Sequence, residues 1–293
     1  MISGFTFIKN GLTLGYPFLE STKTIEPLCG EVIINVGFED KNCKIDDGTY
    51  EYLRDNLNSK KYKFVKSWWD PNISSQGLIL SQQTNIALSK CVGNTCQYIQ
   101  GDEAIHEDDL SNIEAGHKEL NDRNDIFGLI FKYIHFYGNT NIYRHTRSVY
   151  RREVRAIKNG QNIISWKDAQ GFRFKNKTKI AAKLIDARIF HYGWARPQEI
   201  MNKKIESFEK LYHGKEHKQE EAFAYKKIWG LKKFEGEPPQ LLKDWVKENT
   251  HPINIMNLEK SYRWKDWDLM VSDFIEDITG YRIGEYKNYR LVR

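Results

Sequence analysis

Residues 95–103 read Thr-Cys-Gln-Tyr-Ile-Gln-Gly-Asp-Glu, a short run of strand-forming residues that ends abruptly in a glycine and two acids. Such a run predicts a buried β-strand, with the acids emerging where the strand stops. In an α/β sheet, ligands bind outside the carboxyl ends of the strands. Carboxylate oxygens suit Mg²⁺ or Mn²⁺, and a bound cation can hold phosphate oxygens. The stretch predicts either a metal and phosphate site or a polar strand end in which Asp102 caps the next helix.

Strand-like and helix-like segments alternate through the first hundred residues. Strands are predicted over residues 2–8, 31–37, 62–68 and 95–100, and helices over residues 16–26, 49–57 and 77–91. This alternation predicts a mainly parallel sheet with helices on both faces. Several strand segments are almost continuously apolar, as expected where a sheet is covered on both sides.

The pattern changes after residue 103. We predict a helix over residues 108–120 and strands over residues 126–137, 149–157, 162–166 and within 179–192. The charged end of the chain predicts helices over residues 197–213, 220–229, 239–249 and 267–278. The fold class is therefore α/β, with a mixed sheet flanked by helices over residues 1–195. Residues 196–293 are predicted to form a helical C-terminal extension that packs on or beside this domain.

Composition excludes several classes of protein. The net charge of +6 comes from basic residues interleaved with acids, which is typical of solvated helix faces and disfavours a nucleic-acid partner. Four cysteines lack the spacing of a zinc site and indicate a reducing compartment. We expect no transmembrane segment and no signal peptide, and hence a cytoplasmic protein or one peripheral to a membrane. The motifs of Rossmann dinucleotide sites, P-loops, HExxH metalloproteases and α/β-hydrolases are absent.

Three further places carry candidate functional residues. Residues 46–49 read Asp-Asp-Gly-Thr and form either a plain turn with a threonine cap or a carboxylate site for a base or ribose. His191 follows an apolar run and is either a packed histidine or a metal ligand beside Asp102. Asp168 lies in a polar loop and is either a turn residue or a general base for an acceptor hydroxyl.

Taken together, the Asp-Asp-Gly-Thr and Gly-Asp-Glu sequences resemble family-2 glycosyltransferases with the GT-A fold, the Rossmann-like nucleotide-diphospho-sugar transferase fold. More narrowly, the chain is similar to a group of bacterial-type family-2-like proteins. The resembling sequences cover residues 3–10, 46–49, 98–103, 131–138, 150–153, 168–173, 191–194 and 284–289. The similarity spans nearly the whole chain.

The resemblance implies a sugar transfer with inversion from a nucleotide-sugar, preferably a UDP-sugar, to a glycan or other hydroxyl acceptor. It implies a divalent cation, Mn²⁺ or Mg²⁺. The implied nucleotide and substrate contacts are Thr6, Asn10, Asp46, Asp47, Gln100, Gly101 and Trp194. The implied metal ligands are Asp102, His191 and Glu103. Asp168, chosen from its own loop, is the candidate base.

One position departs from the family's pattern. The Asp-x-Asp metal motif maps onto residues 100–102, so that Gln100 stands in place of the first acid. This substitution favours a second hypothesis, a non-catalytic GT-A-like protein that binds a nucleotide-sugar or a glycan. A nucleic-acid-binding protein ranks last.

Overall fold

The first hundred residues form the strands and helices that their alternation predicts. The computed structural model describes residues 1–73, 76–213, 222–250, 253–262 and 264–292. The elements of the first part are β1 (Ile2–Ile8), α1 (Phe18–Ile25), η1 (Glu26–Leu28), β2 (Glu31–Phe38), α2 (Thr49–Asn56), β3 (Tyr62–Trp68), α3 (Leu78–Leu88) and β4 (Thr95–Tyr98). β2 is buried along its whole length, as expected of a central strand covered on both faces.

The middle of the chain is richer in strands, also as predicted. Its elements are β5 (Glu103–Ile105), η2 (Glu107–Asp109), α4 (Leu110–Asp122), β6 (Gly128–Tyr137), β7 (Asn139–Arg144), β8 (Arg152–Lys158), β9 (Ile163–Trp166), β10 (Gly171–Phe174) and β11 (Ala181–Trp194). The strands β5, β7 and β10 were not predicted.

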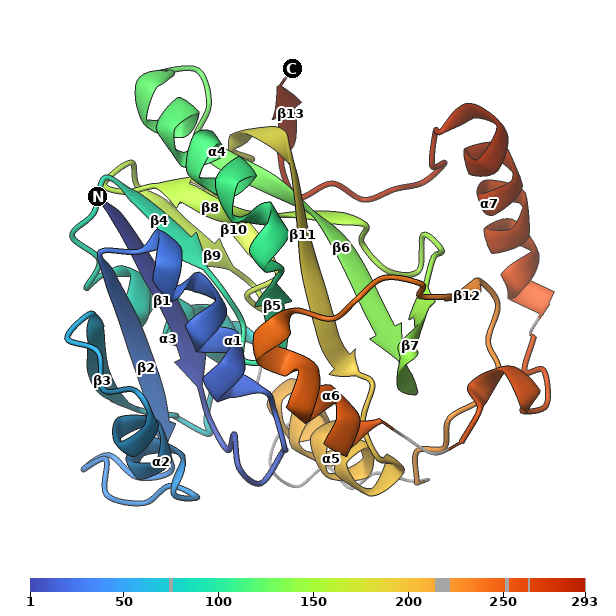
Figure 1. Ribbon diagram of the computed structural model, residues 1–293, viewed down its shortest axis with the longest axis horizontal. Helices are drawn as coiled ribbons and strands as arrows, with labels where there is room; N and C mark the ends of the chain where they lie inside the picture. The colour runs from blue at the N-terminus through green and yellow to red at the C-terminus, as the bar shows by residue number, and fades with distance from the viewer. Residues whose placement is uncertain (74–75, 214–221, 251–252, 263, 293) are drawn as a thin grey trace.

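The central sheet is mixed, and the directions of its strands bring several carboxyl ends to one edge (Figure 1). β3, β2, β1 and β4 are neighbours in that order and run parallel. β8 is antiparallel to both β4 and β6, and β11 is parallel to β6. β6 and β11 therefore run in the same direction as β1 and β4. The carboxyl ends of β1, β4, β6 and β11 consequently lie at one edge of the sheet.

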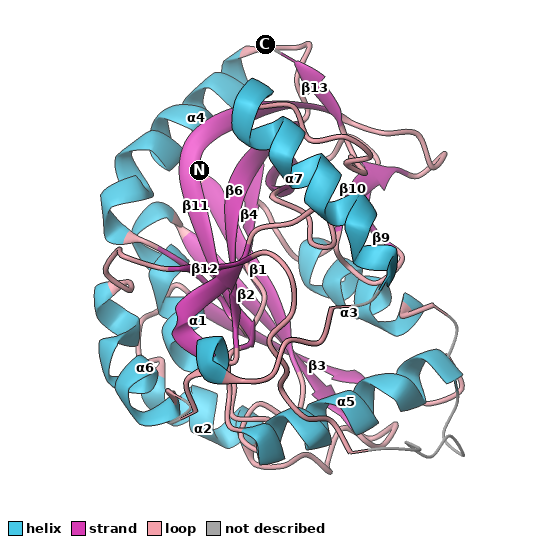
Figure 2. Cartoon of the chain, turned by 90° about the vertical axis from the view of Figure 1, so that its right-hand side faces the viewer, coloured by secondary structure: helices cyan, strands magenta, loops and turns pink. Residues whose placement is uncertain are grey.

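Helices cover both faces of the sheet (Figure 2). On one face, α1, α2 and α4 bury side chains such as Ile25, Leu53 and Ile113 against it. On the other face, α3 packs against β1 and β2 and also contacts the small hairpin of β9 and β10. Here Tyr98 stacks on Phe5 with ring centroids 5.0 Å apart. The hairpin is thus fixed beside the end of β4, which matters for the cavity described below.

The C-terminal part is less helical than predicted. It contains α5 (Gln198–His213), β12 (Leu231–Lys233), η3 (Gln240–Leu242), α6 (Lys243–Asn249), η4 (Ile255–Asn257), η5 (Trp264–Asp266), α7 (Trp267–Thr279) and β13 (Arg290–Val292). β12 pairs with β7 and β13 pairs with β11, so both join the central sheet.

The helix predicted over residues 220–229 is wrong for residues 222–229, which form no helix; the first two residues lie outside the described part. Phe223 and Tyr225 are two residues apart and pack into the same apolar cluster with Tyr137. A period of two suits extended chain, whereas a helix would turn these rings away from each other. Tertiary packing therefore overrides the charged, helix-like composition.

α7 is attached by its charged face. Glu276 accepts a hydrogen bond from Arg151 at 2.7 Å, and Asp268 pairs with Arg147. Trp267 and Phe274 on the same helix are more than half exposed. α7, like each of the other described helices, is too short or too polar to cross a membrane.

Candidate functional site

A cavity of about 470 Å³ lies at the edge where the parallel strands end. The ends of β1, β4 and β11, the β9–β10 loop and α5 all contribute to its wall. α5 crosses below the strand ends in the view of Figure 1. Among the residues predicted from sequence, those that line the cavity are Asn10, Gln100, Gly101, Asp102, Asp168, His191 and Trp194. The fold thus collects side chains from four distant parts of the chain.

Aromatic side chains form much of the cavity wall. Tyr16, Trp69, Tyr150, Trp194 and Phe208 all line it. Flat rings of this kind offer apolar area and stacking surfaces to a base or to the face of a sugar. The cavity therefore suits a ligand with planar or ring-shaped parts.

Three of the predicted nucleotide contacts do not line the cavity. Thr6 is fully buried within β1. The Asp46 carboxylate accepts a hydrogen bond from the backbone N–H of Tyr50 at 2.9 Å, at the start of α2. The Asp47 carboxylate accepts one from the N–H of Thr13 at 2.8 Å. Asp46 and Asp47 therefore fasten the loop after β1 and the start of α2, and their contact with a nucleotide stays a prediction.

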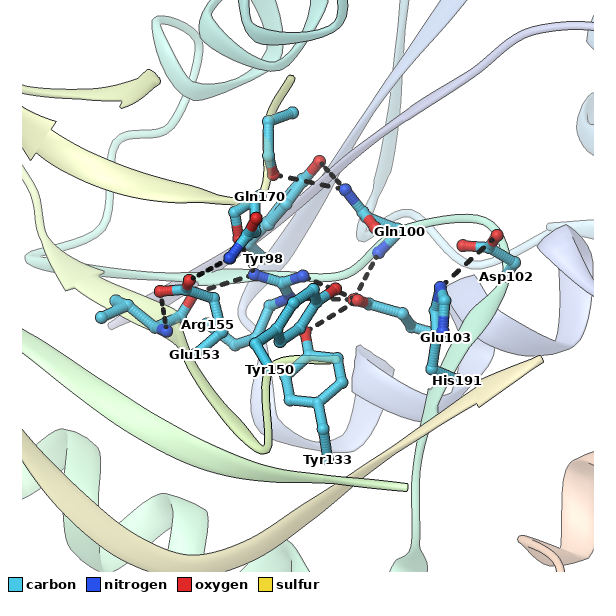
Figure 3. A network of polar contacts seen from close by, with 12 residues as sticks. Tyr98, Gln100, Asp102, Glu103, Tyr133, Tyr150, Glu153, Arg155, Gln170 and His191 are labelled. Atoms are coloured by element: carbon cyan, nitrogen blue, oxygen red, sulfur yellow. Dashed lines mark hydrogen bonds and ion pairs between the residues drawn. The ribbon is translucent and has the colours of Figure 1, made fainter. Parts of the chain in front are cut away.

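Glu103 points into the protein and is held by a buried arginine (Figure 3). Arg155 donates to its two carboxylate oxygens at 2.7 and 2.9 Å, and both side chains have no exposed surface. The Tyr133 hydroxyl donates to the same carboxylate at 2.7 Å, and the Gln100 N–H donates to it at 3.1 Å. The expected role of Glu103 as a metal ligand is therefore corrected: its oxygens are engaged in anchoring the turn after β4.

The side chain of Gln100 is also fixed. Its amide nitrogen lies 3.3 Å from the Tyr98 hydroxyl and 3.3 Å from the carbonyl oxygen of Ala169. The second contact ties the turn after β4 to the β9–β10 loop. Gln100 acts here as a hydrogen-bond donor, which the acid expected at this position could not do when ionised.

Asp102 faces the cavity and is surrounded by cations. Its Oδ2 atom lies 3.2 Å from the ammonium of Lys204 and 3.9 Å from the guanidinium of Arg196. Burial opposes ionisation of this carboxyl, but the nearby charges, Lys204 foremost, hold its pKa well below the usual range. Burial lowers the pKa of Lys204 to about 8, although Asp102 acts in the opposite direction. Asp102 is thus ionised and already has a cationic partner.

Two histidines behind Asp102 form a hydrogen-bonded pair. His135 Nε2 lies 2.6 Å from the carbonyl oxygen of Tyr150, which can only accept, so Nε2 carries the proton. In the neutral ring His135 Nδ1 then accepts from His191 Nδ1 at 3.0 Å. Burial lowers the pKa of both histidines, which favours the neutral rings. His191 Nε2 is then left as an acceptor, 3.8 Å from Asp102.

A glycine is required next to this pair. A Cβ atom at Gly193 would lie 2.7 Å from the His191 ring and 2.9 Å from Asp102 Oδ2. Both distances are shorter than normal van der Waals contact. Gly193 therefore allows His191 and Asp102 to approach from β11 and from the turn after β4.

The residues at this place do not suit a divalent cation. Lys204 and Arg196 already neutralise Asp102. Both oxygens of Glu103 are bound by Arg155. The Gln100 side chain donates its hydrogen bonds to Tyr98 and Ala169. Within the described ranges there is no group of three or more acidic, histidine or cysteine side chains that could hold a metal. An added dication would face two fixed positive charges at short range, which is electrostatically unfavourable.

Asp168 is presented to the cavity by a strained loop. The register of the hairpin pairs Trp166 with Gly171, and Lys167 and Ala169 on either side of Asp168 have φ angles of +52° and +59°. Such left-handed residues cost roughly 1 kcal/mol each. Within the described part of the chain, the Asp168 carboxylate has no hydrogen-bond or ion-pair partner. The loop therefore holds a carboxylate ready for a ligand group.

Sequence reasoning missed Arg196 and Lys204. Arg196 follows β11 directly, and Lys204 lies on α5. A signal for Lys204 was present: Met201, Ile205 and Phe208 form an apolar stripe at helical spacing, and Lys204 lies within it. A lysine on the apolar face of a helix indicates a buried charge with a partner.

No protein-family model and no curated protein matches this chain. Matches among solved structures include S. aureus TarS 1-349, with 12% identity, a TM-score of 0.39 and coverage of 71% of this chain and 64% of that one. A TarS structure in complex with UDP-GlcNAc also matches. The inositol-1-phosphate CTP transferase from T. maritima has 10% identity, a TM-score of 0.36 and coverage of 72% and 96%.

A nucleotidyl transferase from Methanothermobacter thermautotroptrophicus has 12% identity and a TM-score of 0.29, over 48% of this chain and 65% of that one. This chain therefore spans less than two thirds of that protein and of the TarS chain. These likenesses are too weak to assign a family or a function to the chain.

Proposed function

We propose that this protein is a glycosyltransferase that moves a sugar from a nucleoside-diphosphate sugar to an acceptor hydroxyl. The observation that carries the proposal is the composition of one cavity. It combines aromatic walls, the cationic side chain of Lys204 and the unpartnered carboxylate of Asp168 at the carboxyl edge of a parallel sheet. Ligands of α/β sheets bind at this edge. The aromatic walls can stack on rings, the lysine can bind a diphosphate, and the carboxylate can accept a hydroxyl proton.

The proposed reaction assigns a role to Asp168. The acceptor oxygen attacks the anomeric carbon and forms the new C–O bond, while the bond from that carbon to the phosphate oxygen breaks. The electron pair of the broken bond stays on the diphosphate, and the hydroxyl proton passes to the Asp168 carboxylate. A base positioned in this way contributes a rate factor of roughly 10² to 10⁴. Attack from the face opposite the leaving group inverts the anomeric carbon.

A panel of UDP-, GDP- and CDP-sugars tests the proposal. We expect one base to give saturable thermal stabilisation of the whole chain, together with slow release of the nucleoside diphosphate. Asp168→Asn should lower turnover by roughly 10² to 10⁴ while leaving the stabilisation unchanged, because the base acts only on the acceptor. Asp186→Asn, at an exposed ion pair with Lys132, is the matched control and should retain full turnover.

Absence of stabilisation by every nucleotide-sugar would overturn the proposal. Stabilisation without turnover under any condition would instead favour a non-catalytic protein that binds a nucleotide-sugar. Gln100 in place of an acid is the observation that favours this second candidate. Turnover is measured first with water as the acceptor and then with simple glycans.

A further inference from the structure

Asp102 belongs to a charge cluster that is open toward the cavity. The cluster consists of Asp102, Lys204, Arg196 and the neutral His191. Lys204 and Asp102 both line the cavity, whereas Arg196 lies behind Asp102 with no exposed surface. One carboxylate faces two cations, so the cluster keeps a net positive charge. A buried surplus charge is costly and calls for an anionic partner.

Lys204 has donor capacity left over. Its ammonium carries three N–H groups. One contact is to Asp102 Oδ2 at 3.2 Å and a second is to the carbonyl oxygen of Gly193 at 2.8 Å. The side chain is nine-tenths buried, and the cavity is the open space that it lines. A third N–H group is therefore available to a ligand in the cavity.

Two donor atoms of Arg196 also lack a hydrogen-bond acceptor. Its Nη1 atom donates to the carbonyl oxygen of Leu14, but Nε and Nη2 have no hydrogen-bond partner in the described part of the structure. The guanidinium lies 3.9 Å from the centre of the Tyr16 ring, and Tyr16 lines the cavity. Buried guanidinium groups of proteins are normally hydrogen-bonded. Arg196 thus adds positive charge directly behind the cavity wall.

We propose that Lys204, with Arg196 behind it, binds the diphosphate of the donor in place of the divalent cation that the resemblance to family-2 glycosyltransferases implies. This inference rests on the proposed function and names the group that carries the diphosphate charge. Asp102 positions the Lys204 ammonium instead of binding a metal ion.

The chemistry of sugar transfer needs this charge. When the bond between the anomeric carbon and the phosphate oxygen breaks, the leaving nucleoside diphosphate gains one negative charge. A fixed ammonium at that place stabilises the developing charge more than it stabilises the intact donor. The free N–H of Lys204 donates to a phosphate oxygen, and no metal ion is required to balance the step.

Calorimetric titration of the whole chain tests the inference. The probes are UDP and uridine, CDP and cytidine, and GDP and guanosine, each in EDTA and again with Mn²⁺. We expect at least one nucleoside diphosphate to bind equally well in EDTA and in Mn²⁺, and more tightly than its nucleoside. Binding that requires Mn²⁺ would overturn the inference and leave the proposed glycosyltransferase intact. Failure of all the probes under both conditions would overturn both.

Variants then locate the binding charge. Lys204→Met should weaken the binding of the nucleoside diphosphate by roughly 10- to 100-fold, the value of a charge-assisted hydrogen bond. The affinity for the nucleoside should not change. Lys204→Arg should restore part of the loss. Lys132→Met removes an exposed lysine and should change neither affinity.

A double variant tests the inference even if Lys204→Met alone fails to fold. Asp102→Asn with Lys204→Met removes both charges of the pair, so that no Asp102 carboxylate is left without its nearest cation. It should fold and should lose diphosphate affinity as the single lysine variant does. Unchanged diphosphate affinity in Lys204→Met or in the double variant would contradict the inference.

Discussion

Two neighbouring carboxylates, Glu103 and Asp102, have opposite surroundings. Glu103 and Arg155 form a closed pair: both side chains are fully buried, and Tyr133 and Gln100 supply further hydrogen bonds to the carboxylate. Asp102 belongs to an open cluster at the cavity wall, in which two cations share one carboxylate and donor groups remain unpaired. A closed pair fixes a turn, whereas an open cluster can receive a ligand. Unpaired donor groups beside a cavity, rather than acidity, distinguish the Asp102 cluster from the Glu103 pair.

The largest effect should follow from breaking the closed pair. Arg155→Met would leave the Glu103 carboxyl in the core without its cationic partner, which costs about 3–5 kcal/mol of unfolding free energy. Urea denaturation measures this loss. Asp186→Asn, at an exposed ion pair, should give no measurable change in the midpoint. A loss for Arg155→Met no larger than that for Asp102→Asn would remove the distinction between the two sites.

A third buried carboxylate, Glu153, sharpens the comparison because it has no cation in direct contact. It accepts hydrogen bonds from the Val154 N–H and from the Gln170 amide, and burial raises its pKa to about 7 from an ordinary 4.5. Between these two values the folded protein holds a proton that the unfolded chain has released. The contribution of Glu153 to stability therefore falls as the pH rises through this window.

Glu153→Gln should remove that dependence. At pH 8 the variant should be more stable than the parent by about 2–3 kcal/mol, because glutamine cannot ionise. The difference should shrink toward pH 5, where Glu153 is protonated in the folded state. Urea denaturation between pH 5 and pH 8 measures it. A difference that stays constant across this range would show that Glu153 does not titrate there.

The smallest effect on stability should come from opening the Asp102 cluster. Asp102→Asn should cost about 1–2 kcal/mol, the order of a single charged hydrogen bond. The cost is limited because the Lys204 ammonium keeps its hydrogen bond to the Gly193 carbonyl when the contact with Asp102 is lost. Nucleoside diphosphate binding in EDTA should remain measurable. Binding by the parent protein only in Mn²⁺, together with complete loss of that binding in Asp102→Asn, would indicate instead that Asp102 holds the diphosphate as a metal ligand.

The sequence predicted the first part of the fold well because each element carries its own pattern. β2 is a mostly apolar run and β4 a run of strand-forming residues, each followed by polar residues, and a buried strand shows this signal without reference to its neighbours. The extended segment around Tyr225 was mistaken for a helix, because its charges suit a helix and its inward rings matter only once Tyr137 is in place. The short strands could not be predicted for the same reason.

The residues of the candidate site also divide into those that the sequence predicts and those that it does not. Asp168, Asp102 and His191 could be proposed from sequence, because each follows a strand or occupies a loop beside one, and all three line the cavity. Glu103 could not be separated from Asp102, since adjacent acids look alike until the partner Arg155 is known. Lys204 arrives from a helix about one hundred residues further along the chain, a separation that no local pattern bridges.

By itself, the sequence determined the alternation of strands and helices, the edge at which polar residues collect and the replacement of an expected acid by Gln100. These are local properties, set by side-chain period and by residues at strand ends. The tertiary structure alone decided which carboxylate is closed and which is open, because burial and ion pairing depend on the segments that meet. Arg155 reaches Glu103 from β8, and Lys204 reaches Asp102 from α5. The partner of each acid, and with it the chemistry proposed for each, was therefore fixed only by folding.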